Sequence, residues 1–285
     1  MDAPVPQRSV VTLSCHDQPG IVHAVSGAIV TAQGNITESQ QYSSPDSGRF
    51  FMRIEVEHTS SQEELRAHLR PVTERLGGQC EVDAADRPRR CLILVSTTPH
   101  CLHALLSRRR LGTLPIDVPM ILSNHPDLAN VADFYGLPFE WQPVSPATKP
   151  QMEDRIRQLV AEYDIELVVL ARYMQILSSE LSDELAGRAI NIHHSFLPGF
   201  KGANPYRQAH ARGVKLIGAT AHFVTADLDE GPIIAQHVTS VNHNKTVTQL
   251  VEIGRDIESV TLAEAVRLFV QHRILLDGLR TVIFD

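Results

Sequence analysis

Apolar and polar positions in the first third of the chain repeat with two periods. Strict alternation is typical of half-buried strands, whereas apolar residues spaced three and four apart are typical of helices. The pattern predicts strands at 8–14, 35–43, 49–57 and 79–82 and helices at 21–33 and 61–76. The second helix begins with a capping-box pattern, because Ser61 is followed three residues later by Glu64. The resulting βαββαβ order is the ferredoxin-like arrangement, which we expect over residues 1–84.

Beyond residue 90 the apolar runs become nearly continuous and alternate with helical patterns. Such strands, separated by helices, indicate a parallel sheet with helices on both faces. Strands are predicted at 91–96, 118–123, 167–170, 189–193, 217–224, 233–238 and 280–284, and helices at 102–109, 128–135, 151–163, 179–185 and 246–269. The charged, proline-containing stretch 85–90 has no apolar periodicity and is the predicted linker. We therefore expect a second α/β domain over 91–285, with a Rossmann-like, mostly parallel sheet.

Two polar residues lie near the end of the predicted strand 189–193. Alternation along the strand places Asn191 and His193 on the same face. Pro198 and Gly199 follow and break regular structure. Ligands of open α/β sheets bind at the carboxyl ends of the strands, so we expect both polar side chains to lie at a binding crevice.

The chemistry of these side chains suits a reacting carbonyl group. A carboxamide N–H and a protonated imidazole both donate hydrogen bonds, and two donors aimed at one point stabilise an oxyanion. Asp229 lies in an Asp-Glu-Gly-Pro turn between two predicted strands and can supply a base. Each feature also has an ordinary explanation, because Asn-x-His occurs by chance and Asp commonly forms turns. His194 falls on the opposite strand face from His193 and is expected to be only its neighbour.

Composition narrows the class of protein. The 285 residues carry a net charge of −7, with 43% hydrophobic and 21% charged residues, which is typical of a globular chain with two domains. The acidic balance argues against nucleic-acid binding, which relies on basic surfaces. No apolar run reaches the roughly 18 residues of a membrane span, and no signal-peptide pattern is present, so a cytoplasmic location is expected. The four cysteines include no Cys-x-x-Cys pair, which favours reduced thiols.

The block from Asn191 to Pro232 resembles the catalytic core of the 10-formyltetrahydrofolate-dependent formyltransferase superfamily. The signature of that superfamily is Asn-x-His, followed further along the chain by an Asp before Gly-Pro, and all of these positions are present. The resemblance implies that Asn191, His193 and Asp229 are catalytic. It also implies that His222 lies close to them and supports their geometry.

The same resemblance implies a pterin slot, formed by the segment after the strand 167–170 and by the loop before Asp229. The matching residues are Tyr173, Met174, Gln175, Leu177 and Val224, with His222 beside them. Members of the superfamily often carry arginine where this chain has Gln175. Core packing at a helix entry is an equally good explanation of the apolar members of this set. The substrate implied is 10-formyltetrahydrofolate, with no tightly bound cofactor and no metal.

The amino-terminal pattern, with its Asp-Gln-Pro-Gly turn at 17–20, looks like an ACT domain, a module that commonly binds amino acids. An ACT-like module followed by a formyltransferase-like module is similar to the formyltetrahydrofolate deformylase family. That family hydrolyses 10-formyltetrahydrofolate to tetrahydrofolate and formate, in one-carbon and purine metabolism. The segment 96–101 contains no glycine that could form the phosphate cradle of a transferase acting on a phosphorylated amine.

The partners that these resemblances imply are the folate, water, an amino-acid effector at the ACT-like domain, and further copies of the chain in a homo-oligomer. Three alternative functions stay open at this point. One is formyl transfer to a small amine, and another is a non-catalytic folate or amino-acid sensor. The third is a hydroxymethyl or formyl hydrolase that acts on another folate form.

Overall fold

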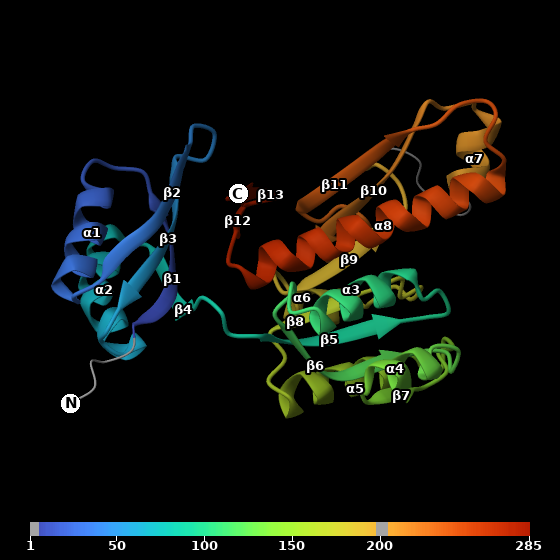
Figure 1. The fold of residues 1–285 in the computed structure, drawn as a ribbon, viewed down its shortest axis with the longest axis horizontal. Helices are drawn as coiled ribbons and strands as arrows, with labels where there is room; N and C mark the ends of the chain where they lie inside the picture. Colours follow the sequence, from blue (N-terminus) through green and yellow to red (C-terminus); the bar gives the residue numbers. More distant parts are fainter. Residues whose placement is uncertain (1–5, 198–204) are drawn as a thin grey trace. The chain divides into compact units, whose positions relative to one another are not determined.

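The computed structural model describes residues 6–197 and 205–285 (Figure 1). The contacts between its residues divide the chain into two units. The first contains the chain up to Arg87 together with Gln271–Asp285, and the second contains Pro88–Val270. Pro198 and Gly199, which the sequence pattern assigned to a break after the strand, lie outside the described residues.

The first unit has the predicted βαββαβ order. Its elements are β1 (Gln7–His16), α1 (Ile21–Thr31), β2 (Asn35–Ser44), β3 (Arg49–His58), α2 (Gln62–Leu76) and β4 (Gln79–Ala84). The sheet order is β2-β3-β1-β4, and β1 is antiparallel to both of its neighbours. Apolar side chains of the sheet and both helices form one core, which includes Leu13, Ile29, Ile54 and Leu65. The capping box at Ser61 and Glu64 is present, so the amino-terminal prediction is confirmed.

The carboxyl-terminal segment joins the first unit, which corrects the predicted domain boundary. It forms a hairpin of β12 (Ile274–Asp277) and β13 (Arg280–Ile283), so the strand predicted at 280–284 lies here and not in the second domain. The Ser44 hydroxyl donates to Asp277 Oδ2 at 2.8 Å, and Arg280 pairs with Asp46 at 2.6 Å. These partners are far apart in the sequence, and periodicity carries no information about such pairs.

The linker is shorter than the predicted 85–90, because the charges at its end belong to the next sheet. Strand β5 (Arg89–Val95) begins inside the predicted linker. The Arg89 guanidinium pairs with Glu166 at 2.6 Å, and that of Arg90 pairs with Asp164 at 3.0 Å. A charged stretch was therefore misinterpreted as solvated chain.

The second unit is built on a mixed, mostly parallel sheet, as predicted. After β5 come α3 (His100–Arg110), β6 (Ile116–Ser123), α4 (Ala129–Tyr135), β7 (Phe139–Trp141), α5 (Lys149–Glu162), β8 (Leu167–Leu170), α6 (Ser179–Glu184), β9 (Ala189–His193), α7 (Pro205–Ala211), β10 (Leu216–Phe223), β11 (Ile233–Ser240) and α8 (Val247–Val270). The strand order is β11-β10-β9-β8-β5-β6-β7. Strands β5 to β9 pair in parallel, while β10 and β11 pair antiparallel. The short elements β7, α7 and β12 were not predicted.

The strand order predicts a ligand-binding crevice at the carboxyl ends of β5 and β8. From β5 the chain continues to β6 on one side, and it later returns to β8 on the other side of β5. The loops that leave two such strands diverge, which is where ligands of doubly wound sheets bind. The long helix α8 packs against β9, β10 and β11 and also contacts α3 and α7 (Figure 1).

The side chain of Arg53 should be a main support of the first unit. It is 1% exposed, its Nη2 donates to Glu55 Oε1 at 2.7 Å, and its Nε donates to the Gln271 carbonyl at 3.2 Å. Arg53→Ala leaves these acceptors buried without their partner, so we expect the free energy of unfolding of this unit to fall by about 3–5 kcal/mol. Denaturant-dependent hydrogen exchange of the β3 amides measures it.

Arg8→Ala is the matched control, because Arg8 bonds the same Glu55 carboxylate at 2.9 Å from a side chain that is 47% exposed. We expect a loss below about 1 kcal/mol for this variant. Equal losses in the two variants would contradict the assigned role of Arg53.

Candidate active site

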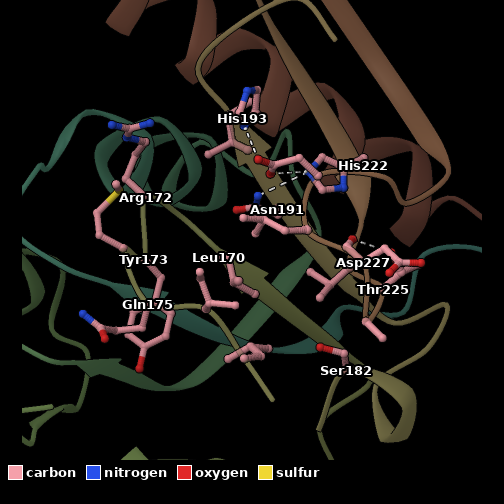
Figure 2. Close-up of a pocket in the computed structure, with 18 of the residues that line it drawn as sticks. Leu170, Arg172, Tyr173, Gln175, Ser182, Asn191, His193, His222, Thr225 and Asp227 are labelled. Atoms are coloured by element: carbon pink, nitrogen blue, oxygen red, sulfur yellow. Dashed lines mark hydrogen bonds and ion pairs between the residues drawn. The ribbon is translucent and has the colours of Figure 1, made fainter. Parts of the chain in front are cut away.

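A pocket of about 350 Å³ lies at the carboxyl ends of β8 and β9 (Figure 2). Four segments line it: the end of β8 with the loop that follows, Ser182 of α6, the end of β9, and the end of β10 with the loop to β11. Every site residue predicted from the sequence is among the lining residues: Tyr173, Met174, Gln175, Leu177, Asn191, His193, His222, Val224 and Asp229. The fold thus gathers positions more than fifty residues apart in the sequence into one cavity.

Pairing of β9 with β10 places the polar side chains opposite one another. Asn191 and His222 are directly opposed in the antiparallel register, and the amide nitrogen of Asn191 lies 3.3 Å from His222 Nε2. His222 Nδ1 donates to the Phe223 carbonyl oxygen at 2.8 Å. Because a carbonyl oxygen can only accept, this bond fixes a proton on Nδ1 and leaves Nε2 facing the pocket.

Asp229 connects the two histidines of the site. Its Oδ2 lies 3.2 Å from His193 Nδ1 and its Oδ1 lies 3.6 Å from His222 Nε2. Burial alone would raise the pKa of the Asp229 carboxyl group, but hydrogen bonds and charge from both histidines lower it well below its ordinary value. Asp229 is therefore a carboxylate across the neutral range. The other imidazole nitrogen of His193, Nε2, lies 2.8 Å from the Ser195 hydroxyl.

The turn that carries Asp229 is tightly constrained. Asp229 has a positive φ of 58°, an uncommon conformation for a residue other than glycine. A β-carbon at Gly231 would overlap the carbonyl oxygen of Phe223, so only glycine fits there. The Phe223 N–H donates to the Pro232 carbonyl at 2.9 Å and closes the turn. The Asp-Glu-Gly-Pro sequence thus holds the carboxylate against the histidines.

The loop after β8 is held at two points. The Met174 N–H donates to the Ser96 hydroxyl at 2.9 Å, and Ser96 donates to Asn124 Oδ1 at 2.6 Å. Further along, the N–H and hydroxyl of Ser178 donate to the buried carboxylate of Glu153 at 2.8 and 2.6 Å. The loop therefore presents a preformed surface to the pocket.

Apolar side chains form the walls of the pocket away from His193. Met174 and Ile176 are 58% and 61% exposed, and Leu228 on the opposite loop is 58% exposed. Exposed apolar residues on two facing loops are typical of a binding site for a flat, partly apolar ligand. Tyr173 and Leu177 line the pocket and are also buried in a core that includes residues of α5 and α6, so core packing explains both, and their contact with a pterin stays a prediction.

His194 was expected on the far side of the strand, and the structure corrects this. Strand β9 ends at His193, so alternation no longer applies to the next residue. His194 lines the same pocket, with its ring centre 5.0 Å from that of His193. Burial, together with the positive charges of Arg172 and His193, lowers the pKa of His194 from 6.5 to about 4. His194 is therefore neutral near pH 7.

Behind this end of the pocket lies a polar cluster that sequence reasoning missed. Glu258 of α8 is 2% exposed, and its carboxylate accepts from His100 Nε2 at 2.8 Å and from the Tyr206 hydroxyl at 2.7 Å. Arg172, which lines the pocket, places its Nε 3.4 Å from the same carboxylate. We call these four residues the Glu258 network. A sequence signal existed, because Glu258 follows Leu250 and Gly254 at intervals of four residues. The three residues therefore lie on one face of α8, and all three are buried.

The Glu258 network also borders a group with metal-ligand chemistry. Ligand atoms of His100, Cys101 and Glu258 lie within 4.8 Å of one another. Burial and the Glu258 charge raise the pKa of the Cys101 thiol, which disfavours the thiolate that a metal needs. Burial would also raise the pKa of Glu258, but the hydrogen bond from His100 and the charge of Arg172 hold it below its ordinary value. These groups therefore fit an internal ion network better than a metal site.

Comparison with known proteins identifies the family. A formyl transferase family model matches residues 89–266, and an ACT domain model matches residues 9–73. The formyltetrahydrofolate deformylase of Corynebacterium sp. strain P-1 is 47% identical over 280 residues, which cover 97% of this chain and 98% of the relative. The chain belongs to the formyltetrahydrofolate deformylase family.

Solved structures agree with this assignment to the deformylase family. The crystal structure of formyltetrahydrofolate deformylase from Burkholderia mallei is 48% identical, with a TM-score of 0.95, and the match covers 98% of this chain and all of that one. Glycinamide ribonucleotide transformylase 1 from Symbiobacterium toebii is 32% identical with a TM-score of 0.64 and matches only 70% of this chain. The likeness to the deformylase spans both units, whereas the likeness to the transformylase leaves part of the chain unmatched.

The electrostatic environment of His194 can be tested by NMR. We expect its imidazole to titrate near pH 4, below the ordinary value of 6.5. As the pH falls from 6.5 to 4, the unfolded chain takes up a proton at this residue that the folded chain does not, so stability should decrease. Arg172→Met removes one of the nearby cations and should move the transition upward, while burial keeps it below 6.5. A His194 that titrates at its ordinary value in the parent protein would contradict this description.

Proposed function

We propose that this chain hydrolyses 10-formyltetrahydrofolate to tetrahydrofolate and formate. The observation that carries the proposal is the Asp229 carboxylate, held between His193 and His222 beside Asn191, in a pocket with apolar walls. This arrangement combines an ionised carboxylate with hydrogen-bond donors, which is what attack on a formyl carbon requires. The relatives that match nearly the whole chain carry the name formyltetrahydrofolate deformylase.

In the proposed mechanism the pterin ring lies between the loops that carry Met174 and Leu228, with its formyl group toward His193. Asp229 orders a water molecule and takes its proton, directly or through a second water, as the oxygen bonds to the formyl carbon. His193 and Asn191 donate to the developing oxyanion. When the intermediate collapses, the bond from carbon to N10 breaks, the proton is delivered to N10, and formate leaves.

The lowered pKa of Asp229 has a consequence for this mechanism. A carboxylate of low pKa is ionised from the start but is a weak base. Its bond to His193 must therefore loosen as it takes the proton from water, while the imidazole turns its hydrogen bonding toward the oxyanion. Asp229 and His193 act as one unit in this scheme.

The remaining predictions concern the effector and assembly of the protein, its location, its metabolic pathway and its metal content. We propose that the ACT domain binds an amino-acid effector and that the chain forms a homo-oligomer. A hollow between α1 and α2 is lined by His23, His68 and Arg75, and such cationic and hydrogen-bonding groups suit a carboxylate ligand.

Among the described helices, none is both long and apolar enough to cross a membrane. The cytoplasmic location, the link to purine synthesis and the absence of a metal stay predictions.

The proposal predicts that Asp229→Asn lowers kcat by about 100-fold or more, because the amide cannot take a proton and carries no negative charge to stabilise the imidazolium of His193. Asn191→Ala, which removes one oxyanion donor, should lower kcat by about 100-fold. Tetrahydrofolate and formate are measured with 10-formyltetrahydrofolate in buffer that contains no amine.

Glu230→Gln is the matched control, because it removes the same charge from the next residue, which is exposed and is not among the pocket-lining residues. We expect it to retain the parent rate. Retained activity in Asp229→Asn would overturn the role of Asp229. Turnover by the parent only after an amine is added would instead indicate a transferase, and binding without turnover would indicate a sensor.

A further inference from the structure

The backbone at Arg172 is unusual and lies at the pocket. Arg172 has a positive φ of 64°, a conformation that favours glycine and is unfavourable for a bulky residue. Such strain persists where the surrounding structure imposes it, most often at functional sites. Glycine would relieve it, so the arginine side chain must contribute something that glycine cannot.

The Glu258 network fixes the arginine in place. Its members come from four places in the second unit: the start of α3, the loop after β8, α7 and α8. Room for Tyr206 depends on Gly254, since a β-carbon there would overlap the Tyr206 hydroxyl. A buried carboxylate with several partners contributes more to fixed geometry than to net stability. The arginine Nε thus lies within ion-pair distance of Glu258, and the terminal nitrogens make no hydrogen bond with any residue that the structure describes.

Arg172 lies toward one end of the pocket, and the apolar slot lies toward the other. Figure 2 shows Arg172 and His193 in one part of the cavity, and Tyr173, Gln175, Leu170 and Ser182 in the other part. A pterin in the slot would direct its formyl group toward His193. Any second substrate must reach the formyl carbon past the remaining wall, which Arg172 and His194 help to form.

We propose that Arg172, held by the Glu258 network, is the specificity-determining residue that makes water the formyl acceptor. Its permanent positive charge repels an ammonium group, and its bulk occupies the space that an amine substrate would need. A water molecule is neutral and small, so it is not excluded. Formate, the anionic product of hydrolysis, is also favoured by a nearby guanidinium. This inference rests on the proposed function.

The two reactions differ in the atom that attacks. In hydrolysis the water oxygen bonds to the formyl carbon, the bond to N10 breaks, and N10 gains a proton. In transfer an amine nitrogen makes the new bond instead, and the proton that it loses ends on N10. The same Asn191, His193 and Asp229 serve both reactions, so access to the formyl carbon decides between them.

Arg172→Gly tests the proposal, because glycine adopts the required backbone without strain. The parent and the variant are given 10-formyltetrahydrofolate with and without glycinamide, a small primary amine. Tetrahydrofolate is followed by absorbance, formate is measured enzymatically, and N-formylglycinamide is measured by mass spectrometry. The parent should release one formate for each tetrahydrofolate under both conditions. In the variant we expect formylation of the amine to rise by at least about tenfold, and formate per tetrahydrofolate to fall.

Arg172→Lys is the control, since it keeps the charge and most of the length, and it should still release formate alone. Equal formate and tetrahydrofolate from Arg172→Gly at every amine concentration would overturn the proposal. If Arg172→Gly does not fold, as judged by circular dichroism, Glu258→Gln decides, because it frees the arginine from its anchor and should also yield formylated amine. Failure of the proposed function is a separate result, seen as a parent protein that makes no formate without amine.

Discussion

The candidate active site depends on one carboxylate that is shared between two imidazoles. Asp229 approaches both His193 and His222, and each of these histidines is fixed from its own strand, β9 or β10. The pairing register of these strands sets Asn191 against His222, and the Gly231 turn returns the chain so that Asp229 reaches them. A shift of one residue between β9 and β10 would turn these side chains to the other face of the sheet. Strand register is therefore the constraint that the chemistry requires.

Two residues with an unfavourable backbone conformation lie at this pocket. Among the described residues other than glycine, five have a positive φ, and two of them, Arg172 and Asp229, line the pocket. Both are held by partners on other elements, Glu258 in one case and the two histidines in the other. The sheet and its helices therefore support two unfavourable local conformations, as expected when a site is preorganised before its ligand binds.

Much of this architecture could be predicted from the sequence, because its signals are local. Alternation and helical spacing located most elements, and the Asn191, His193 and Asp229 pattern led to residues that share one pocket. Prediction from the sequence pattern failed where a feature depends on contacts between residues that are far apart in the chain. Glu258 meets Arg172 and His100 only through the packing of α8, and residues 271–285 meet the first unit only through pairs such as Ser44 with Asp277. His194 was misplaced because the alternation was extended one residue beyond the end of the strand.

The return of the chain to its first unit affects the order in which the protein can fold during synthesis. Residues up to Arg87 leave the ribosome first, yet Gln271, whose carbonyl bonds the buried Arg53, is made near the end. Domains that form during synthesis usually complete themselves in order from the amino terminus. Here the ion pairs of Arg53 with Glu38 and Glu55 can form early, but its Nε lacks the Gln271 acceptor until the whole second unit has been translated. The second unit is a continuous segment, so it can close before the first unit is complete.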